Sequence, residues 1–136
     1  MAEHTGRCLC GDVKYAIGAD PVMAGVCHCK NCQRQAGSAF STLWGVPTAA
    51  LTFTATLPKC FEDKTSDSGG LVQRYFCGCC GSPIYSALSG QPDMVFVKAG
   101  TLDNADEFTP GFHLWCDSKQ PWVDIPAGVP SMAKQS

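Results

Sequence analysis

Cysteine clustering is the feature that most constrains how this chain can fold. Eight of the ten cysteines fall into three short groups: Cys8-Leu9-Cys10-Gly11, Cys27-His28-Cys29-Lys30-Asn31-Cys32 and Cys77-Gly78-Cys79-Cys80-Gly81. In extended backbone, residues i and i+2 point to the same side, so a C-x-C pair presents both sulfurs to one ion. A C-x-x-C turn does the same by curling the chain, and a following glycine permits positive φ. The three groups therefore predict metal binding.

A disulfide framework is the other common use of so many cysteines, and it belongs to secreted chains. The polar start, residues 1–5, lacks a basic segment followed by an apolar core. No stretch approaches the roughly 18 consecutive apolar residues of a membrane span. A net charge of −2 with no basic run argues against a nucleic-acid partner. We expect a cytoplasmic protein with no membrane or nucleic-acid partner.

Turn-forming residues favour strands over long helices in this chain, since it holds 14 glycines and 9 prolines. Residues 12–17 alternate apolar and polar side chains and predict a half-buried strand. Further predicted strands, rich in β-branched and aromatic residues, are 24–27, 41–46, 51–54, 71–76, 84–87, 94–99, 112–115 and 122–125. One short helix is predicted at residues 30–35, ended by Gly37. We expect a mainly β fold of antiparallel sheets with short irregular helical turns.

The length of 136 residues suits one domain, and the cysteine groups recur without a fixed period. We therefore expect a single zinc-binding domain over residues 1–136. Its core covers about residues 6–125, and residues 126–136 form a loose tail.

Zinc is the metal we expect, because soft thiolates suit it and its tetrahedral site needs no particular d-electron geometry. An iron–sulfur centre is the weaker rival. Counting ligands pairs the first and third groups in a closed, structural four-thiolate site made by Cys8, Cys10, Cys77 and Cys80. Such a site would join segments about seventy residues apart and hold the β core together.

The second cysteine group would hold the other zinc ion. Cys27, Cys29 and Cys32 supply three ligands, which leaves a tetrahedral ion one position for water or a substrate thiolate. The sequence therefore predicts two zinc ions per chain, one structural and one open to chemistry.

The second group has an alternative interpretation, in which a fourth protein ligand closes it. The candidates are His28, Cys79, Cys60 and Cys116. Extended geometry turns His28 away from its two neighbours. Cys60 and Cys116 stand alone, and we expect both to be buried. Cys79 is either a small buried residue or a free thiol that resolves oxidised species.

Three motifs share order and spacing with a known family. They are Gly6-x-Cys8-x-Cys10-Gly11-x-Val13-x-Tyr15, Cys27-His28-Cys29-x-x-Cys32-x-x-x-x-Gly37-Ser38 and Arg74-x-Phe76-Cys77-x-x-Cys80-Gly81. They resemble the glutathione-dependent formaldehyde-activating enzymes, which include the centromere protein V type proteins. The segment from His113 to Trp122 also resembles the ending of that family. The resemblance covers roughly residues 6 to 125.

The resemblance implies a β-tent fold and a carbon–sulfur lyase that joins formaldehyde to glutathione or splits the adduct. It implies that the reactive zinc is held by the positions matching Cys27, Cys29 and Cys32. The structural zinc is held by the positions matching Cys8, Cys10, Cys77 and Cys80. The extra Cys79 departs from the family pattern.

We therefore expect a zinc-dependent carbon–sulfur lyase whose partners are a thiol such as glutathione and a small aldehyde. The alternative is a non-catalytic, zinc-stapled binding module, and a redox-sensing protein that uses Cys79 ranks third. His113 is a candidate for proton transfer, with a core role as the commoner case. Candidate pocket aromatics, each more commonly a core residue, are Phe40, Trp44, Trp115 and Trp122.

Overall fold

The computed structural model describes residues 3–66 and 69–135. Strands dominate it: β1 (His4–Arg7), β2 (Lys14–Ile17), β3 (Met23–Cys27), β4 (Ser41–Pro47), β5 (Leu51–Phe53), β6 (Lys59–Asp63), β7 (Val72–Phe76), β8 (Pro83–Leu88), β9 (Met94–Val97) and β10 (His113–Leu114). The helical elements are α1 (Lys30–Ala36), η1 (Thr48–Ala50), η2 (Ala99–Thr101), η3 (Ala105–Glu107) and η4 (Cys116–Ser118). The mainly β fold with short helical turns is thus confirmed.

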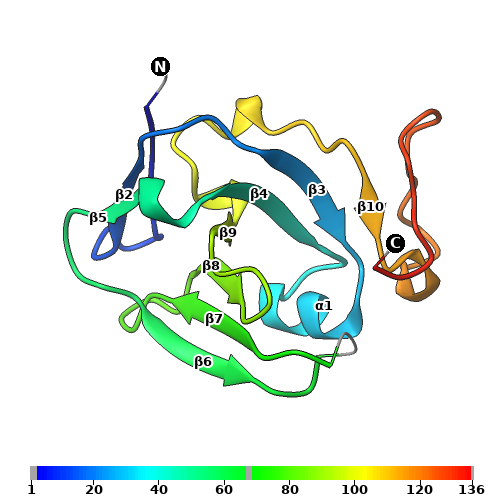
Figure 1. The fold of residues 1–136 in the computed structure, drawn as a ribbon, viewed down its shortest axis with the longest axis horizontal. Helices are drawn as coiled ribbons and strands as arrows, with labels where there is room; N and C mark the ends of the chain where they lie inside the picture. Colours follow the sequence, from blue (N-terminus) through cyan, green and yellow to red (C-terminus); the bar gives the residue numbers. More distant parts are fainter. Residues whose placement is uncertain (1–2, 67–68, 136) are drawn as a thin grey trace.

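The strands form two sheets within the part of the chain that the structure describes. The smaller sheet has the order β1-β2-β5, and the larger has the order β10-β3-β4-β9-β8-β7-β6. Neighbouring strands are antiparallel except for β10, which runs parallel to β3. Figure 1 shows the larger sheet curving from β10 through β3 and β4 to β7 and β6. This curvature gives the sheet an inner and an outer face.

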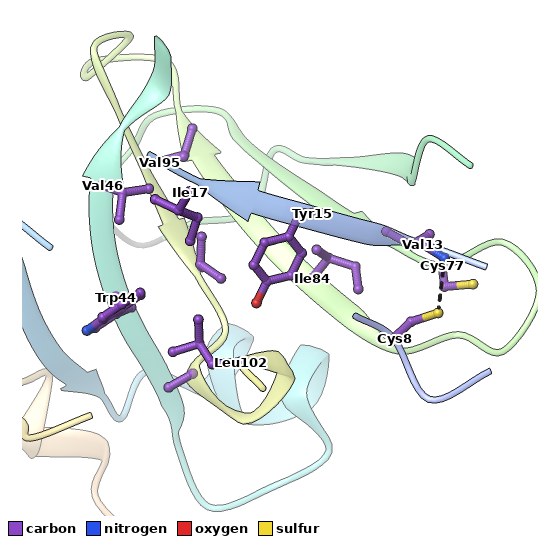
Figure 2. Packing of buried hydrophobic residues seen from close by; sticks show 12 residues of the cluster. Cys8, Val13, Tyr15, Ile17, Trp44, Val46, Cys77, Ile84, Val95 and Leu102 are labelled. Carbon is purple, nitrogen blue, oxygen red and sulfur yellow. Dashed lines mark hydrogen bonds between the residues drawn. The ribbon is translucent and has the colours of Figure 1, made fainter. Parts of the chain in front are cut away.

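The hydrophobic core lies between the smaller sheet and one face of the larger sheet. Tyr15 and Ile17 on β2 pack against Val46 on β4 and Val95 on β9 (Figure 2). Successive side chains of a strand point to opposite faces, so every second residue of β4 and β9 enters this core. The remaining residues of these two strands face the other side of the sheet.

Helix α1 begins within the second cysteine group, directly after Cys29. The Cys29 side chain caps the helix by accepting a hydrogen bond from the Cys32 backbone N–H at 3.3 Å. At the other end Gly37 takes the left-handed conformation, with φ of 62°, and its N–H bonds to the carbonyl of Arg34. The helix predicted at residues 30–35 is therefore confirmed, with one further residue.

Three details of the strand prediction are wrong, and the first is that β1 was not predicted. Residues 122–125 form no strand, and the Trp122 side chain is 72% exposed. Strand β6 was not predicted because its first four residues are exposed and give no alternating pattern. It pairs only with β7 at the edge of the larger sheet, so its residues do not need to be apolar on one face.

Backbone hydrogen bonds join residues 130–134 of the C-terminal segment to β10 and the residues after it. The His113 N–H donates to the Pro130 carbonyl at 2.9 Å, and the Met132 N–H donates to the His113 carbonyl at 2.9 Å. The Trp115 N–H donates to the Lys134 carbonyl, also at 2.9 Å. Strand β10 pairs with β3 on its other side, so this segment satisfies an otherwise open sheet edge. Ser136 lies outside the described residues.

Among the described residues, no helix has both the length and the apolar character needed to cross a membrane.

Candidate metal centres and an adjoining cavity

The first and third cysteine groups meet in space, as predicted. Cys8 and Cys10 follow β1, whereas Cys77 and Cys80 follow β7. The sulfurs of Cys8 and Cys10 are 3.6 Å apart, and those of Cys10 and Cys77 are 3.8 Å apart. All four sulfurs lie within 4.8 Å of one another. Tetrahedral zinc with Zn–S bonds of about 2.3 Å separates its sulfurs by about 3.8 Å, so this four-cysteine group fits a metal ion.

Backbone amides orient these sulfurs before any metal is considered. The Val13 N–H donates to Cys8 Sγ at 3.3 Å, beside the core (Figure 2). Cys77 Sγ accepts from the N–H groups of Cys79 at 3.3 Å and Cys80 at 3.4 Å. Hydrogen bonds with Ser82 lower the pKa of the Cys80 thiol to about 5. Such donors stabilise thiolate, which is the form that binds metal.

The second cysteine group forms a separate three-cysteine group. Cys27 ends β3, Cys29 caps α1 and Cys32 lies in the first turn of that helix. Their three sulfurs lie within 4.8 Å of one another. Among the described residues, no fourth histidine, cysteine, aspartate or glutamate side chain joins them. The donor set fits a metal ion that keeps one coordination position for another ligand.

Two buried cations accompany the three-cysteine group. Lys98 is 7% exposed, and its Nζ donates to Ser41 Oγ, whose residue pairs with Cys27 across β3 and β4. Arg74 is 5% exposed, and its Nε donates to Asp63 Oδ2 at 2.9 Å. Burying a charge is costly unless a partner compensates it, so these cations indicate negative charge nearby.

The thiols of the three-cysteine group divide that negative charge unequally. Hydrogen bonds from Cys27 and Cys29, with the charges of Lys98 and Arg74, lower the pKa of the Cys32 thiol to about 2 against the effect of burial. Hydrogen bonds with Cys29 and Cys32, together with burial, raise the pKa of the Cys27 thiol. Although burial opposes it, the charges of Cys32 and Asp63 raise the pKa of Arg74. Cys32 is therefore the group's most stable thiolate.

A cavity of about 420 Å³ opens beside the three-cysteine group and includes all three cysteines in its lining. Its floor is the face of the larger sheet that points away from the core. Leu43 on β4 and Phe96 on β9 lie on this face, next to core residues of the same strands. Met23, Leu88 and Met94 add to the floor. The three-cysteine group therefore lies at an apolar cavity that sequence periodicity did not indicate.

The C-terminal part of the chain forms one wall of this cavity. Phe112, Leu114, Trp115 and Met132 all line it. Trp115 has a φ of 57°, a left-handed conformation that is unusual for a large side chain. Hydrogen bonding of its N–H to Lys134 holds this residue in place.

His28 and His113 form a buried pair behind the three-cysteine group. His28 Nε2 lies 2.9 Å from His113 Nδ1, and the rings stack at 5.2 Å. Burial lowers the pKa of both histidines, which favours neutral rings. Their other ring nitrogens have no hydrogen-bond partner in the described part of the chain. His28 thus turns away from the cysteine sulfurs, as the extended geometry predicted.

The predicted pocket aromatics have four different environments. Trp115 lines the cavity. Trp44 is 1% exposed in the core, and Phe40 packs edge-on against His28 with the ring centroids 5.7 Å apart. Trp122 is exposed and does not line the cavity. Hydrophobicity alone did not distinguish these environments.

Cys60 and Cys116 differ from their predicted burial, and Cys79 is not the small buried residue of its first interpretation. Cys60 on β6 and Cys79 are exposed, and Cys116 is half-buried. Cys79 lies with Cys10 and Asp12 on the surface beside the four-cysteine group. None of these residues supplies a fourth ligand to the three-cysteine group.

The buried cations were not predicted as site residues. Arg74 belongs to the third motif and Lys98 to the predicted strand 94–99, and neither position indicates a buried charge. Their role depends on pairing between β3, β4 and β9, which brings Lys98 near a cysteine far away in the sequence.

Comparison with known proteins identifies the family to which this chain belongs. The family model for the glutathione-dependent formaldehyde-activating enzyme matches residues 3–118, and the chain belongs to that family. A putative glutathione-dependent formaldehyde-activating enzyme of Emericella nidulans is 32% identical over 82 residues, which are 60% of this chain and 40% of that protein. A protein of the same printed name from Talaromyces marneffei is 28% identical over 117 residues, which are 82% of this chain and 60% of that protein.

Two further comparisons extend this result. An uncharacterized lyase of Schizosaccharomyces pombe is 25% identical over 130 residues, covering 92% of this chain and 87% of that protein. A crystal structure of a Rhodobacter sphaeroides protein superposes with a TM-score of 0.57 at 19% identity, over 73% of this chain and 87% of that one. The last likeness concerns the fold alone.

Proposed function

We propose that this protein is a zinc-dependent carbon–sulfur lyase acting on the adduct of glutathione and an aldehyde. The observation that carries the proposal is a three-cysteine group without a fourth protein ligand among the described residues, placed at the edge of a cavity. Family membership supports glutathione-dependent formaldehyde activation as the kind of reaction.

Two zinc ions per chain belong to this proposal. Cys8, Cys10, Cys77 and Cys80 would hold a structural ion, and Cys27, Cys29 and Cys32 would hold the reactive one. Zinc bound there would supply Lewis acidity and lower the pKa of a thiol in its open position. The short spacing of the sulfurs and the absence of carboxylates from both groups suit this soft metal.

The chain's own residues would prepare the thiol and the carbonyl group for reaction. Three thiolates leave a divalent ion with a net charge of −1, and a fourth thiolate makes it −2. Lys98 and Arg74 together offset that charge from buried positions. In the forward direction, the sulfur attacks the carbonyl carbon, and the proton lost by the thiol ends on the new hydroxyl oxygen. Cleavage of the adduct reverses both transfers.

The environment of the protein is part of the same proposal. All ten cysteines are free in the structure, which suits a reducing compartment such as the cytoplasm. We also propose that this fold is the β-tent fold that the family resemblance implies.

The proposal is tested by following adduct exchange directly. Exchange between free and glutathione-bound ¹³C-formaldehyde is measured by NMR with and without the protein, after native mass spectrometry has counted zinc per chain. We expect two zinc ions and accelerated exchange. Two zinc ions without acceleration, and without a retained glutathione, would instead support a non-catalytic zinc-stapled binding module. A single zinc ion would show that our division of the cysteines is wrong.

A further inference from the structure

The cavity beside the three-cysteine group is larger than formaldehyde requires. Formaldehyde contributes one carbon atom, whereas a volume of about 420 Å³ falls within the roughly 300–1,000 Å³ of sites for small organic ligands. Ten of the described lining residues, besides the three cysteines, are apolar. The space is therefore suited to a larger and more hydrophobic group than the hydroxymethyl of a formaldehyde adduct.

Two glycines in the larger sheet allow apolar side chains of the cavity lining to pack directly against its backbone. A Cβ at Gly45 would lie 2.6 Å from Met23 Sδ and 3.1 Å from Met94 Sδ. A Cβ at Gly25 would lie 2.5 Å from the ring of Phe112. The two methionines and the phenylalanine therefore occupy the space that a side chain at either glycine position would fill. Methionine thioethers adapt to ligands of different shape, which suits a site for flexible hydrocarbon.

The charges around the cavity do not match those of glutathione. Glutathione carries two carboxylates and one ammonium group. Arg74 is the one lining residue of permanent charge in the described part of the chain, and Asp63 and Cys32 already engage it. Lys98 is bonded to Ser41 and does not line the cavity. A carboxylate buried there would lack a free counterion, so the arms of glutathione belong at the mouth of the cavity.

We propose that the cavity binds an uncharged, apolar organic group attached to the sulfur that reaches the three-cysteine group. The substrate is then a carbon–sulfur adduct with a hydrophobic substituent, larger than the formaldehyde adduct. The substituent comes from the aldehyde half or from the thiol half. This inference rests on the proposed function, because it assigns the substrate class of the same site.

Titration calorimetry on the zinc-loaded protein tests the proposal without relying on turnover. S-methylglutathione and S-hexylglutathione differ only in the group placed where the aldehyde carbon would be. We expect S-hexylglutathione to bind at least tenfold more tightly, since each buried methylene contributes about fourfold. Benzyl mercaptan and glutathione form the second pair. A tenfold preference for benzyl mercaptan, with no preference for the hexyl group, would place the substituent on the thiol half.

The outcomes separate this inference from the proposed function. If neither pair shows a preference, the apolar substituent is overturned, while the formaldehyde-exchange assay still decides the lyase activity. If a preference appears, exchange is measured with hexanal as well as with formaldehyde. Absence of exchange with both aldehydes would overturn the lyase proposal, and the cavity assignment would stand.

A pair of matched variants locates the binding. Met94→Lys places a charge on the cavity floor, whereas Leu57→Lys places the same charge at a residue that is 71% exposed and outside the cavity. We expect the first variant to reduce the preference to less than threefold and the second to keep it. Circular dichroism checks folding, and Leu88→Asn is the substitute if Met94→Lys does not fold. A preference retained in the folded cavity variant would overturn the assignment.

Discussion

The four-cysteine group and the three-cysteine group use the same side chains in opposite surroundings. The first joins the ends of β1 and β7, and two of its members, Cys8 and Cys77, are part of the hydrophobic core. The second comes from one short segment that runs from the end of β3 into the first turn of α1, and it borders a cavity. The first group is thus placed to link distant segments, whereas the second is placed to meet a ligand.

The groups that surround the sulfurs also differ in charge between the two cysteine groups. Backbone N–H groups and Ser82 hold the four-cysteine sulfurs. The three-cysteine group has the buried charges of Lys98 and Arg74 beside it. Neutral hydrogen-bond donors are sufficient to stabilise the thiolates of a closed metal site. Positively charged side chains can in addition balance the charge of a substrate thiolate that binds to an open site. The comparison teaches that cysteine spacing alone does not decide whether a metal centre is structural or reactive.

The largest effect should come from opening the four-cysteine group. Cys80→Ser removes one proposed ligand of a metal that links β1 to β7, so we expect loss of one zinc ion and a melting temperature lower by roughly 10 °C or more. Thermal unfolding by circular dichroism and native mass spectrometry measure both. Cys60→Ser, at an exposed cysteine outside both groups, is the control. Equal stability of the two variants would contradict a structural role.

The corresponding change in the three-cysteine group should separate activity from folding. Serine is a good helix cap, so Cys29→Ser keeps the cap of α1 while removing one proposed ligand. We expect the second zinc ion to be lost and adduct exchange to fall about a hundredfold or more, with stability changed by roughly 1 kcal/mol or less. Unfolding comparable to that of Cys80→Ser would remove the distinction between the groups.

Removal of a buried cation should weaken metal binding at one group only. Lys98→Met preserves much of the side-chain volume but removes the charge beside the three-cysteine group. We expect roughly tenfold weaker zinc binding there and no change at the four-cysteine group. Competition with a chelator measures both affinities, and Lys59→Met on exposed β6 is the control. Unchanged affinity would show that Lys98 does not balance the thiolate charge.

The smallest effect concerns pH. Burial lowers the pKa of His28 and His113, so the folded state binds fewer protons than the unfolded state near their ordinary pKa of about 6.5. Their contribution to stability is complete above that value and is lost as the pH falls through the folded-state pKa. Urea midpoints should therefore decrease from pH 7.5 to pH 5.5.

The variant His113→Gln isolates this contribution from acid loss of metal. We expect its urea midpoint to fall less steeply over the same pH range, because one titrating ring is absent. If the urea midpoints of the variant and of the original protein fall equally with pH, the acid sensitivity comes from the thiolates alone.

Most of the local structure could be predicted from the sequence. Alternation at residues 12–17 corresponds to β2, and the helix at residues 30–35 begins and ends as its capping residues predict. Strands β1 and β6 and the C-terminal segment could not be predicted, because all three are stabilised mainly by backbone bonds to another strand. Such bonds leave no periodic pattern in side chains.

The sequence by itself determined the family, the mainly β fold and the division of seven cysteines into two candidate groups. Short-range spacing carries this information, because a C-x-C or C-x-x-C segment already aims its sulfurs at one point. Only the tertiary structure decided what surrounds each group. Arg74 lies on β7, Met94 lies on β9 and Lys98 directly follows β9, and sheet pairing brings them to the three cysteines. Charge balance and cavity shape depend on such long-range contacts, so no local motif encodes them.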